Sequence, residues 1–226
     1  VKSAYFELPT HYEFYTENYL FDEILFIGDS NIREMSYSHY LNSDNCVSAP
    51  ALMPPEFYFR LCTYKEYENI IKPYDAVIEL MPNYLAIEWG IINVEAGGLA
   101  KFIENYNEVI KSIREIKEDC EIYLISILPV VPVEGSSKPS NGAINIYNYY
   151  VKQLADSEDC YFINVAEVLK DEWGNANPSY YEEDGYHLND AGRQVFVDYL
   201  KNRIPAINKH VEEEAIEEGI EEEVEE

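Results

Sequence analysis

The sequence is poor in basic residues and has no long hydrophobic run. Lysine and arginine number 16 against 43 acidic residues in a chain of 226, so the formal net charge is −27. A chain of this charge repels phosphate backbones and anionic lipid headgroups, and nucleic acid is therefore not an expected partner. The uncharged run over residues 122–133 contains two prolines and is shorter than the roughly 20 residues that a membrane-spanning helix needs. We expect no membrane insertion.

Cysteine and histidine are also scarce, with four of each. The cysteines are widely spaced and form no C-x-x-C pair, which excludes a zinc knuckle and a densely disulfide-bonded miniprotein. Buried free thiols are the expected state, because unpaired cysteine is among the residues most often buried. The histidines show no metal-ligand spacing with these cysteines, so we expect neither a metal ion nor another cofactor.

Apolar residues are abundant, at 47% of the chain, and no Gly/Ser-rich linker divides it. The sequence therefore predicts one domain over residues 22–204. Residues 205–226 hold ten glutamates and one lysine, which predicts a disordered acidic tail, with a partner-binding helix as the alternative. The aromatic-rich residues 1–21 are expected to pack on the domain, and stacking on sugar rings is the alternative for their tyrosines.

Short runs rich in Ile, Leu and Val alternate with longer amphipathic stretches, a pattern typical of β-α units around a parallel sheet. Near-continuous apolar strands imply that helices cover both faces of the sheet. The predicted fold class is α/β, a three-layer α/β/α sandwich with a central parallel sheet. Strands are predicted over residues 24–28, 46–49, 75–81, 122–128 and 161–165, and helices over residues 31–41, 99–117, 143–155 and 190–203.

Ligands in open parallel sheets bind at the carboxyl ends of the strands, and the first predicted strand ends in a polar turn. Gly28 allows the chain to turn sharply, Asp29 follows, and Ser30 falls at the start of the next helix. A serine there lies beside free backbone N–H groups, which suits a nucleophile whose adduct carries negative charge. The alternative is that Asp29 or Ser30 only caps the helix.

Two further segments are suited to complete such a site. Asn83 follows the predicted strand 75–81, where its amide can donate to an oxyanion; a turn-forming asparagine after proline is the alternative. Asp184 and His187 are three residues apart in a polar loop before the last predicted helix. This spacing lets the carboxylate accept a hydrogen bond from Nδ1 of the imidazole and leaves Nε2 free to take a proton from a serine.

The order of these three blocks resembles the SGNH, or GDSL-type, hydrolase family, and the resemblance covers the predicted domain. It implies a flavodoxin-like SGNH hydrolase fold and a serine esterase. Ser30 would then be the nucleophile, His187 the general base and then acid, and Asp184 the residue that orients the imidazole. For the oxyanion hole the resemblance implies the backbone N–H of Ser30, the side chain of Asn83 and, where the family usually has glycine, the backbone N–H of Ala51.

Met81 is a second departure from the family, because it stands where the family has glycine two residues before the asparagine. Side chains close to the three blocks in the sequence are expected to bind the substrate. The predicted substrate-binding residues are Asp29, Tyr84, Trp89 and Trp173.

The sequence thus predicts a metal-independent serine esterase that removes a small acyl group, expected to be acetyl, from a carbohydrate or related hydroxyl through an acyl-enzyme. A small acyl group is expected because no long apolar segment suggests a lid or a lipid tunnel. Two alternatives remain: acyl transfer to another hydroxyl on the same scaffold, and a non-catalytic carbohydrate-binding or interaction module. The start at Val1, the acidic body and the resemblance favour a secreted or cell-surface location. No oligomeric state is predicted.

Overall fold

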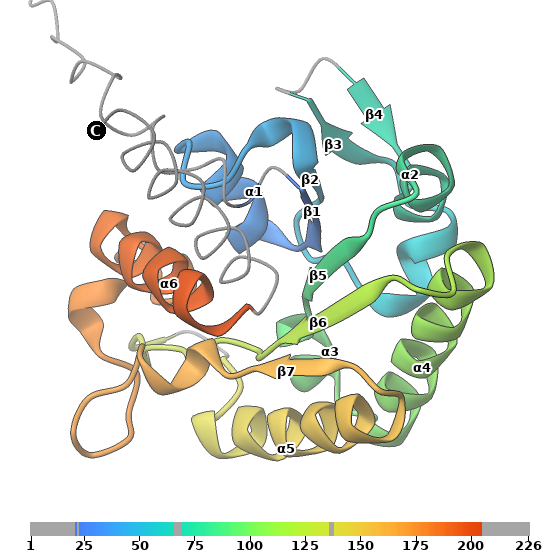
Figure 1. Cartoon of the computed structure of the whole chain (residues 1–226). Coiled ribbons are helices and arrows are strands. Elements are labelled where there is room, and N and C mark those ends of the chain that lie inside the picture. The colour runs from blue at the N-terminus through green and yellow to red at the C-terminus, as the bar shows by residue number, and fades with distance from the viewer. Residues whose placement is uncertain (1–20, 22, 66–68, 136–137, 205–226) are drawn as a thin grey trace, which may run out of the picture.

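The computed structural model describes residues 21, 23–65, 69–135 and 138–204. A seven-stranded sheet in the order β4-β3-β2-β1-β5-β6-β7 forms its centre (Figure 1). The predictions for residues 1–20 and 205–226 lie outside the described residues. The strands are β1 Ile24–Gly28, β2 Cys46–Ser48, β3 Cys62–Tyr64, β4 Asn69–Ile71, β5 Tyr84–Glu88, β6 Glu121–Ile125 and β7 Tyr161–Ile163.

The sheet is parallel over most of its width. β1 pairs in parallel with both β2 and β5, and β6 and β7 extend the parallel part beyond β5. The predicted central parallel sheet is present, and at one edge β3 and β4 add to β2 in antiparallel order. These two strands are short and follow one another closely, so they need no helical crossover between them.

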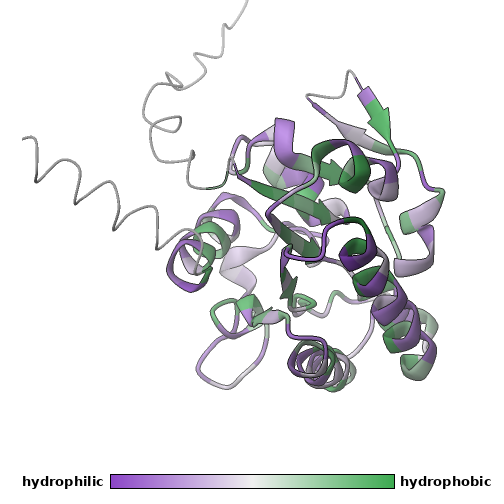
Figure 2. Ribbon diagram, turned by 45° about the vertical axis from the view of Figure 1, so that its right-hand side comes forward, coloured by the Kyte–Doolittle hydropathy of each residue, from purple (hydrophilic) through white to green (hydrophobic). Residues whose placement is uncertain are grey.

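Helices cover both faces of the sheet, which confirms the three-layer α/β/α architecture. One face of β1 packs in a core with α2, α4 and α5, and the other face packs in a core with α1 and α6. The hydrophobic sides of these helices point inward (Figure 2). The helices are α1 Ser30–Tyr37, α2 Pro73–Leu80, α3 Ile91–Ala96, α4 Leu99–Ile116, α5 Asn141–Ser157 and α6 Asp190–Arg203.

The predicted strand over residues 75–81 is wrong, because this segment belongs to helix α2. Pro73 is suited to the first helical turn, where its missing N–H costs nothing, and Asp75 adds a favourable negative charge there. The buried residues Pro73, Ala76 and Val77 recur at helical spacing, whereas Ile78 is 46% exposed. The true strand is β5, which begins at Tyr84, four residues after α2 ends at Leu80.

The cysteines are free thiols. Cys46, Cys62 and Cys120 are buried and Cys160 is half-buried, in agreement with the expected state. Burial raises the pKa of the Cys62 and Cys120 thiols to about 12, so they are not reactive thiolates at neutral pH. Among the described residues, no helix is long and apolar enough to cross a membrane.

Candidate active site

The turn between β1 and α1 presents Ser30. A Cβ on Gly28 would clash with Cγ1 of Ile32 and lie 2.9 Å from the carbonyl oxygen of Glu88, so glycine allows α1 and β5 to pack closely against the end of β1. Asp29 caps α1, because its Oδ1 accepts a hydrogen bond of 3.0 Å from the backbone N–H of Asn31. Ser30 is the first residue of the helix, and neither its hydroxyl nor its backbone N–H bonds to another described residue.

The loop before α6 brings Asp184 and His187 together. Nδ1 of His187 lies 2.5 Å from Oδ2 of Asp184, and Oδ1 accepts hydrogen bonds from the backbone N–H groups of Tyr186 and His187. Partial burial acts to raise the pKa of Asp184, but the hydrogen bonds from His187 and Tyr186 outweigh it and hold this pKa below its usual value. Asp184 is therefore an ionised acceptor at neutral pH, and it leaves Nε2 of His187 available.

This loop lies against the helix that Ser30 begins. The backbone N–H of Leu188 donates to Oδ1 of Asn31 over 3.4 Å, across 157 positions of sequence. Burial raises the pKa of Asp29, and the imidazole of His187, when it is protonated, opposes that rise. Both observations place the His187 loop beside the turn at Ser30.

The two segments meet where ligands bind in folds of this kind. β2 and β5 are the two neighbours of β1 in the sheet (Figure 1). The chain therefore extends the sheet first on one side of β1, with β2, and later on the other side of β1, with β5. Such a reversal of strand order opens a crevice at the carboxyl ends of the two central strands. Ser30 follows the carboxyl end of β1, so it lies at this crevice.

Ala51 belongs to the loop after β2, on the β2 side of Ser30. The backbone N–H of Ala49 donates to the carbonyl of Gly28 over 3.3 Å and ties this loop to the end of β1. Ala51 has a φ of +55°, the left-handed conformation in which an L residue is strained. Its backbone N–H bonds to no described residue, so it is available to a ligand.

We expect Ala51→Gly to raise the free energy of unfolding by roughly 0.5–1 kcal/mol. Glycine relieves the left-handed strain of about 1–2 kcal/mol and loses part of that gain to its greater backbone entropy in the unfolded chain. Urea unfolding measures the change. Ala155→Gly, inside the regular helix α5, is the control and should lower stability. A loss of stability in both variants would contradict the assigned backbone of Ala51.

Comparison with known proteins identifies the family. The model of the GDSL-like lipase/acylhydrolase family matches residues 66–195, which is more than half of the chain. The chain belongs to this family. The matched range includes the Asp184–His187 loop, and the turn at Ser30 lies before it. The protein is an ester-hydrolysing enzyme, as the sequence predicts.

Solved structures share the fold of this GDSL-like hydrolase. An acylhydrolase candidate from Bacteroides fragilis superimposes with a TM-score of 0.63 at 17% identity, covering 83% of this chain and 86% of that one. An acetylxylan esterase from Geobacillus stearothermophilus superimposes with a TM-score of 0.56 at 14% identity, covering 80% and 93%. A curated relative, the N-acylneuraminate cytidylyltransferase of Escherichia coli, is 36% identical over 99 residues, and this chain spans 22% of its length.

The structure places Asn83 far from the crevice of this GDSL-like hydrolase. Asn83 precedes β5, and its carbonyl accepts a hydrogen bond from the backbone N–H of Glu121 at the opposite edge of the sheet. The prediction of Asn83 as an oxyanion donor is therefore wrong. Tyr84 begins β5 at that same edge, so its predicted contact with substrate is also wrong. Met81 caps α2 with a φ of +46° and does not narrow the site.

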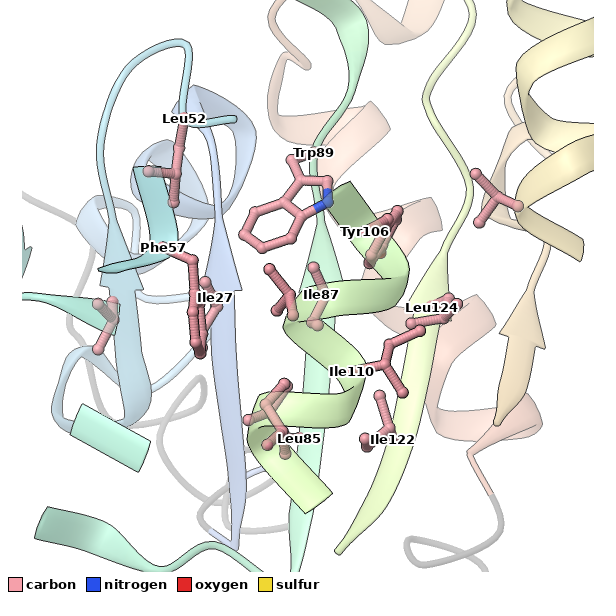
Figure 3. Close-up of a cluster of buried hydrophobic side chains, with 14 of the residues drawn as sticks. Ile27, Leu52, Phe57, Leu85, Ile87, Trp89, Tyr106, Ile110, Ile122 and Leu124 are labelled. Carbon is pink, nitrogen blue, oxygen red and sulfur yellow. The ribbon is translucent and has the colours of Figure 1, made fainter. Parts of the chain in front are cut away.

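The other predicted substrate-binding side chains do not line the crevice either. Asp29 is 1% exposed and serves as the helix cap. Trp89 is also 1% exposed and packs on Tyr106 of α4, with ring centroids 5.3 Å apart (Figure 3). Trp173 is 76% exposed in the loop between β7 and α6. Asp29 and Trp89 are thus structural, and no contact joins Trp173 to the described site.

Sequence reasoning missed Glu88, which ends β5 next to the Ser30 turn. The backbone N–H of Asp29 donates to the carbonyl of Glu88 over 3.1 Å, and both side chains are almost fully buried. Burial and the neighbouring Asp29 carboxyl raise the pKa of Glu88 well above its usual value. The sequence signal that could have identified Glu88 is a glutamate at the end of an apolar run, because buried carboxyl groups are rare.

A second missed group braces the Asp184–His187 loop. Nζ of Lys138 donates to the carbonyl oxygens of Val131, at 2.8 Å, and Asp184. The ammonium also lies 4.5 Å from the centre of the Tyr186 ring. The carbonyl of Gly185 accepts a hydrogen bond from the backbone N–H of Val131 over 3.0 Å. The segment after β6 therefore holds the backbone of this loop in place.

Gly185→Ala is expected to reduce ester hydrolysis by roughly 10²-fold. Gly185 has a φ of +64°, and an added Cβ would lie 2.6 Å from the carbonyl oxygen of Val131, so the loop must shift. Displacement of reacting groups by about 1 Å costs rate on this scale. Steady-state hydrolysis of a small ester measures the effect. Gly174→Ala is the matched control, because Gly174 also has positive φ but has open space around it; equal losses in both variants would contradict the role of this contact.

A hollow of about 480 Å³ lies beside the braced loop. It is formed by α3, the segment before α5 and the first turn of α5, and among the described residues its lining has two charged side chains, Glu95 and Lys138, beside five apolar ones. The Tyr186 hydroxyl donates to Oε1 of Glu95 over 2.5 Å, so the hollow adjoins the His187 loop. No cluster of three His, Cys, Asp or Glu side chains in the described part of the chain is arranged to hold a metal ion.

Proposed function

We propose that this GDSL-like hydrolase uses Ser30 as the nucleophile, His187 as the general base and then acid, and Asp184 as the group that orients the imidazole. The observation that carries the proposal is the Asp184–His187 hydrogen bond in a loop that is bonded to the helix of Ser30. Nε2 of His187 takes the Ser30 proton while the oxygen attacks the ester carbonyl, and the alcohol leaves with that proton. Water, activated by the same imidazole, then releases the acid.

Two backbone N–H groups are proposed to bind the oxyanion. Ser30 and Ala51 both present N–H groups that have no partner among the described residues, and they flank the carboxyl end of β1. Donors fixed before the reaction stabilise developing negative charge without reorganisation. The first turn of α1 adds the partial positive charge of a helix N-terminus.

The ester is proposed to be a small acyl group, acetyl in the first instance, on a sugar. The fold is shared with an acetylxylan esterase. The name of the curated relative points to an N-acylneuraminate as another sugar worth testing. The hollow beside the His187 loop offers Glu95 as a hydrogen-bond acceptor and Lys138 as a donor, a combination that suits sugar hydroxyls. Its volume lies within the range of small-molecule sites.

Ester specificity tests this part of the proposal. Rates are compared for p-nitrophenyl acetate and p-nitrophenyl octanoate, and then for acetylated xylo-oligosaccharides and O-acetylated N-acylneuraminate. The proposal expects acetate to be cleaved at least tenfold faster than octanoate, and at least one acetylated sugar to exceed p-nitrophenyl acetate in kcat/KM. Faster cleavage of octanoate would contradict a small acyl group. Equal kcat/KM for acetylated sugars and p-nitrophenyl acetate would contradict a sugar as the substrate.

A further inference from the structure

Two buried carboxyl groups lie directly beneath the turn that presents Ser30. Asp29 is 1% exposed and Glu88 is 2% exposed, at the carboxyl ends of the adjacent strands β1 and β5. Their side chains lie within hydrogen-bonding reach of each other. No lysine or arginine among the described residues forms an ion pair with either group. The proposed mechanism gives neither carboxyl a step.

The hydrogen bonds around the pair locate one proton. Ionised carboxylates only accept hydrogen bonds, so two carboxyls can bond to each other only when one of them is protonated. Oδ1 of Asp29 accepts from the backbone N–H of Asn31, which favours the charged form of Asp29. Oε2 of Glu88 is buried and receives no hydrogen bond from any described residue. The proton therefore belongs on Glu88.

We propose that Glu88 is a positioning residue, which keeps its proton at neutral pH and donates it to the Asp29 carboxylate, and thereby fixes the turn that presents Ser30. Asp29 is held from three sides: by Asn31 at the helix cap, by the backbone carbonyl of Glu88, and by the Glu88 side chain. Loss of the last contact would free the cap and the adjacent Ser30 N–H. A second buried negative charge would also repel the first.

Other titratable groups face the pair from two packed elements. His187, in the loop before α6, faces Asp29, and Tyr106 of α4 faces Glu88. Burial is the main reason that the pKa of Tyr106 lies well above its usual value, so Tyr106 is neutral at neutral pH. The positive form of His187 would favour an ionised Asp29.

Urea unfolding at pH 6, 7 and 8 tests the proton on Glu88. The unfolded carboxyl is ionised above about pH 4.3, whereas the folded one keeps its proton, so the folded protein binds one proton more and loses stability as the pH rises. Glu88→Gln lacks this proton. The unfolding constant of the wild type divided by that of Glu88→Gln should rise about tenfold per pH unit. A ratio that stays constant from pH 6 to 8 would overturn the proposal.

A control variant and a second measurement keep this test decisive. Glu104→Gln is the control for loss of an exposed carboxyl, 62% exposed in α4, and its ratio should not change with pH. If Glu88→Gln fails to fold, infrared spectroscopy of the wild type at pH 8 tests for the same proton. A protonated buried carboxyl gives a C=O stretching band that ionised carboxylates lack, and absence of this band would again overturn the proposal.

Reaction rates test the positioning role. Glu88→Gln keeps a hydrogen-bond donor toward Asp29, whereas Glu88→Leu does not. Glu88→Leu should therefore lose about 10²-fold in kcat for p-nitrophenyl acetate, and Glu88→Gln no more than a few-fold. Equal losses in the two variants would contradict donation to Asp29. This rate measurement rests on the proposed role of Ser30. The unfolding measurement does not depend on that role, so the change of the unfolding ratio with pH should remain even if the proposed function is wrong.

Discussion

Ser30→Ala is expected to reduce ester hydrolysis by about 10⁴- to 10⁶-fold and to leave the fold unchanged. The substitution removes the oxygen that is proposed to form the acyl bond, and the remaining groups cannot replace it. The Ser30 hydroxyl bonds to no described residue, so its loss should change the free energy of unfolding by no more than about 0.5 kcal/mol. Hydrolysis of p-nitrophenyl acetate and thermal unfolding by circular dichroism measure the two effects.

Ser157→Ala is the matched control for the nucleophile. Ser157 ends α5, next to the start of β7 and therefore at the opposite edge of the sheet from Ser30. Its hydroxyl donates to the carbonyl of Leu154 over 2.9 Å, so this variant should lose some stability and keep its activity. The assignment of Ser30 fails if Ser30→Ala retains more than about a tenth of the wild-type rate.

Asp184→Asn is the second substitution with a large expected effect, a loss of about 10⁴-fold in kcat. The asparagine oxygen can still accept from the backbone N–H groups of Tyr186 and His187, so the loop should keep its shape. What changes is the side-chain contact to Nδ1 of His187, because an amide neither stabilises the imidazolium nor fixes the required tautomer. Asp198→Asn, on the exposed side of α6, is the control.

The pH dependence of the free energy of unfolding provides a second test of Asp184. Asp184 has a folded pKa below its unfolded value of about 3.9, so its contribution is complete above that pH and is lost as the pH falls through the folded pKa. Asp184→Asn should therefore weaken the acid-induced loss of stability below about pH 4, measured by urea unfolding. An Asp184→Asn variant with wild-type kcat would contradict the proposed triad, whatever its behaviour in acid.

Much of the fold follows from local sequence patterns. Residues 99–117 repeat apolar side chains at intervals of three and four, and the structure forms α4 there with that face buried. The helix predicted over residues 190–203 agrees with α6, which Asn189 caps by accepting from the backbone N–H of Gly192. The strand at 24–28 is buried along its whole length, as its continuous apolar run predicts.

The error between residues 73 and 88 has a physical explanation. A short apolar run fits a buried strand and a helix that packs on one side equally well, and periodicity alone does not separate them. The decisive signals were Pro73 at the helix start and Pro82 after its end. The strand β5 was missed because it ends in Glu88, a residue that strands rarely bury.

The same error displaced part of the predicted site. Ser30, Asp184 and His187 lie in segments whose neighbouring elements were predicted correctly, and the structure brings these segments together. Asn83 was assigned to a strand end that does not exist, and Tyr84 was assigned with it. Contacts such as Lys138 to Asp184 join residues 46 positions apart through two loops, and no local pattern predicts such a pairing.

Active-site labelling with a fluorophosphonate tests the central claim most directly. Intact mass and peptide mapping are recorded for the wild type and for His187→Ala. An activated serine predicts a single adduct on Ser30 in the wild type and at least a hundredfold slower labelling in the variant, because His187 no longer removes the serine proton. No adduct on Ser30 under conditions that label a control serine esterase, or labelling at the same rate in His187→Ala, would contradict the account.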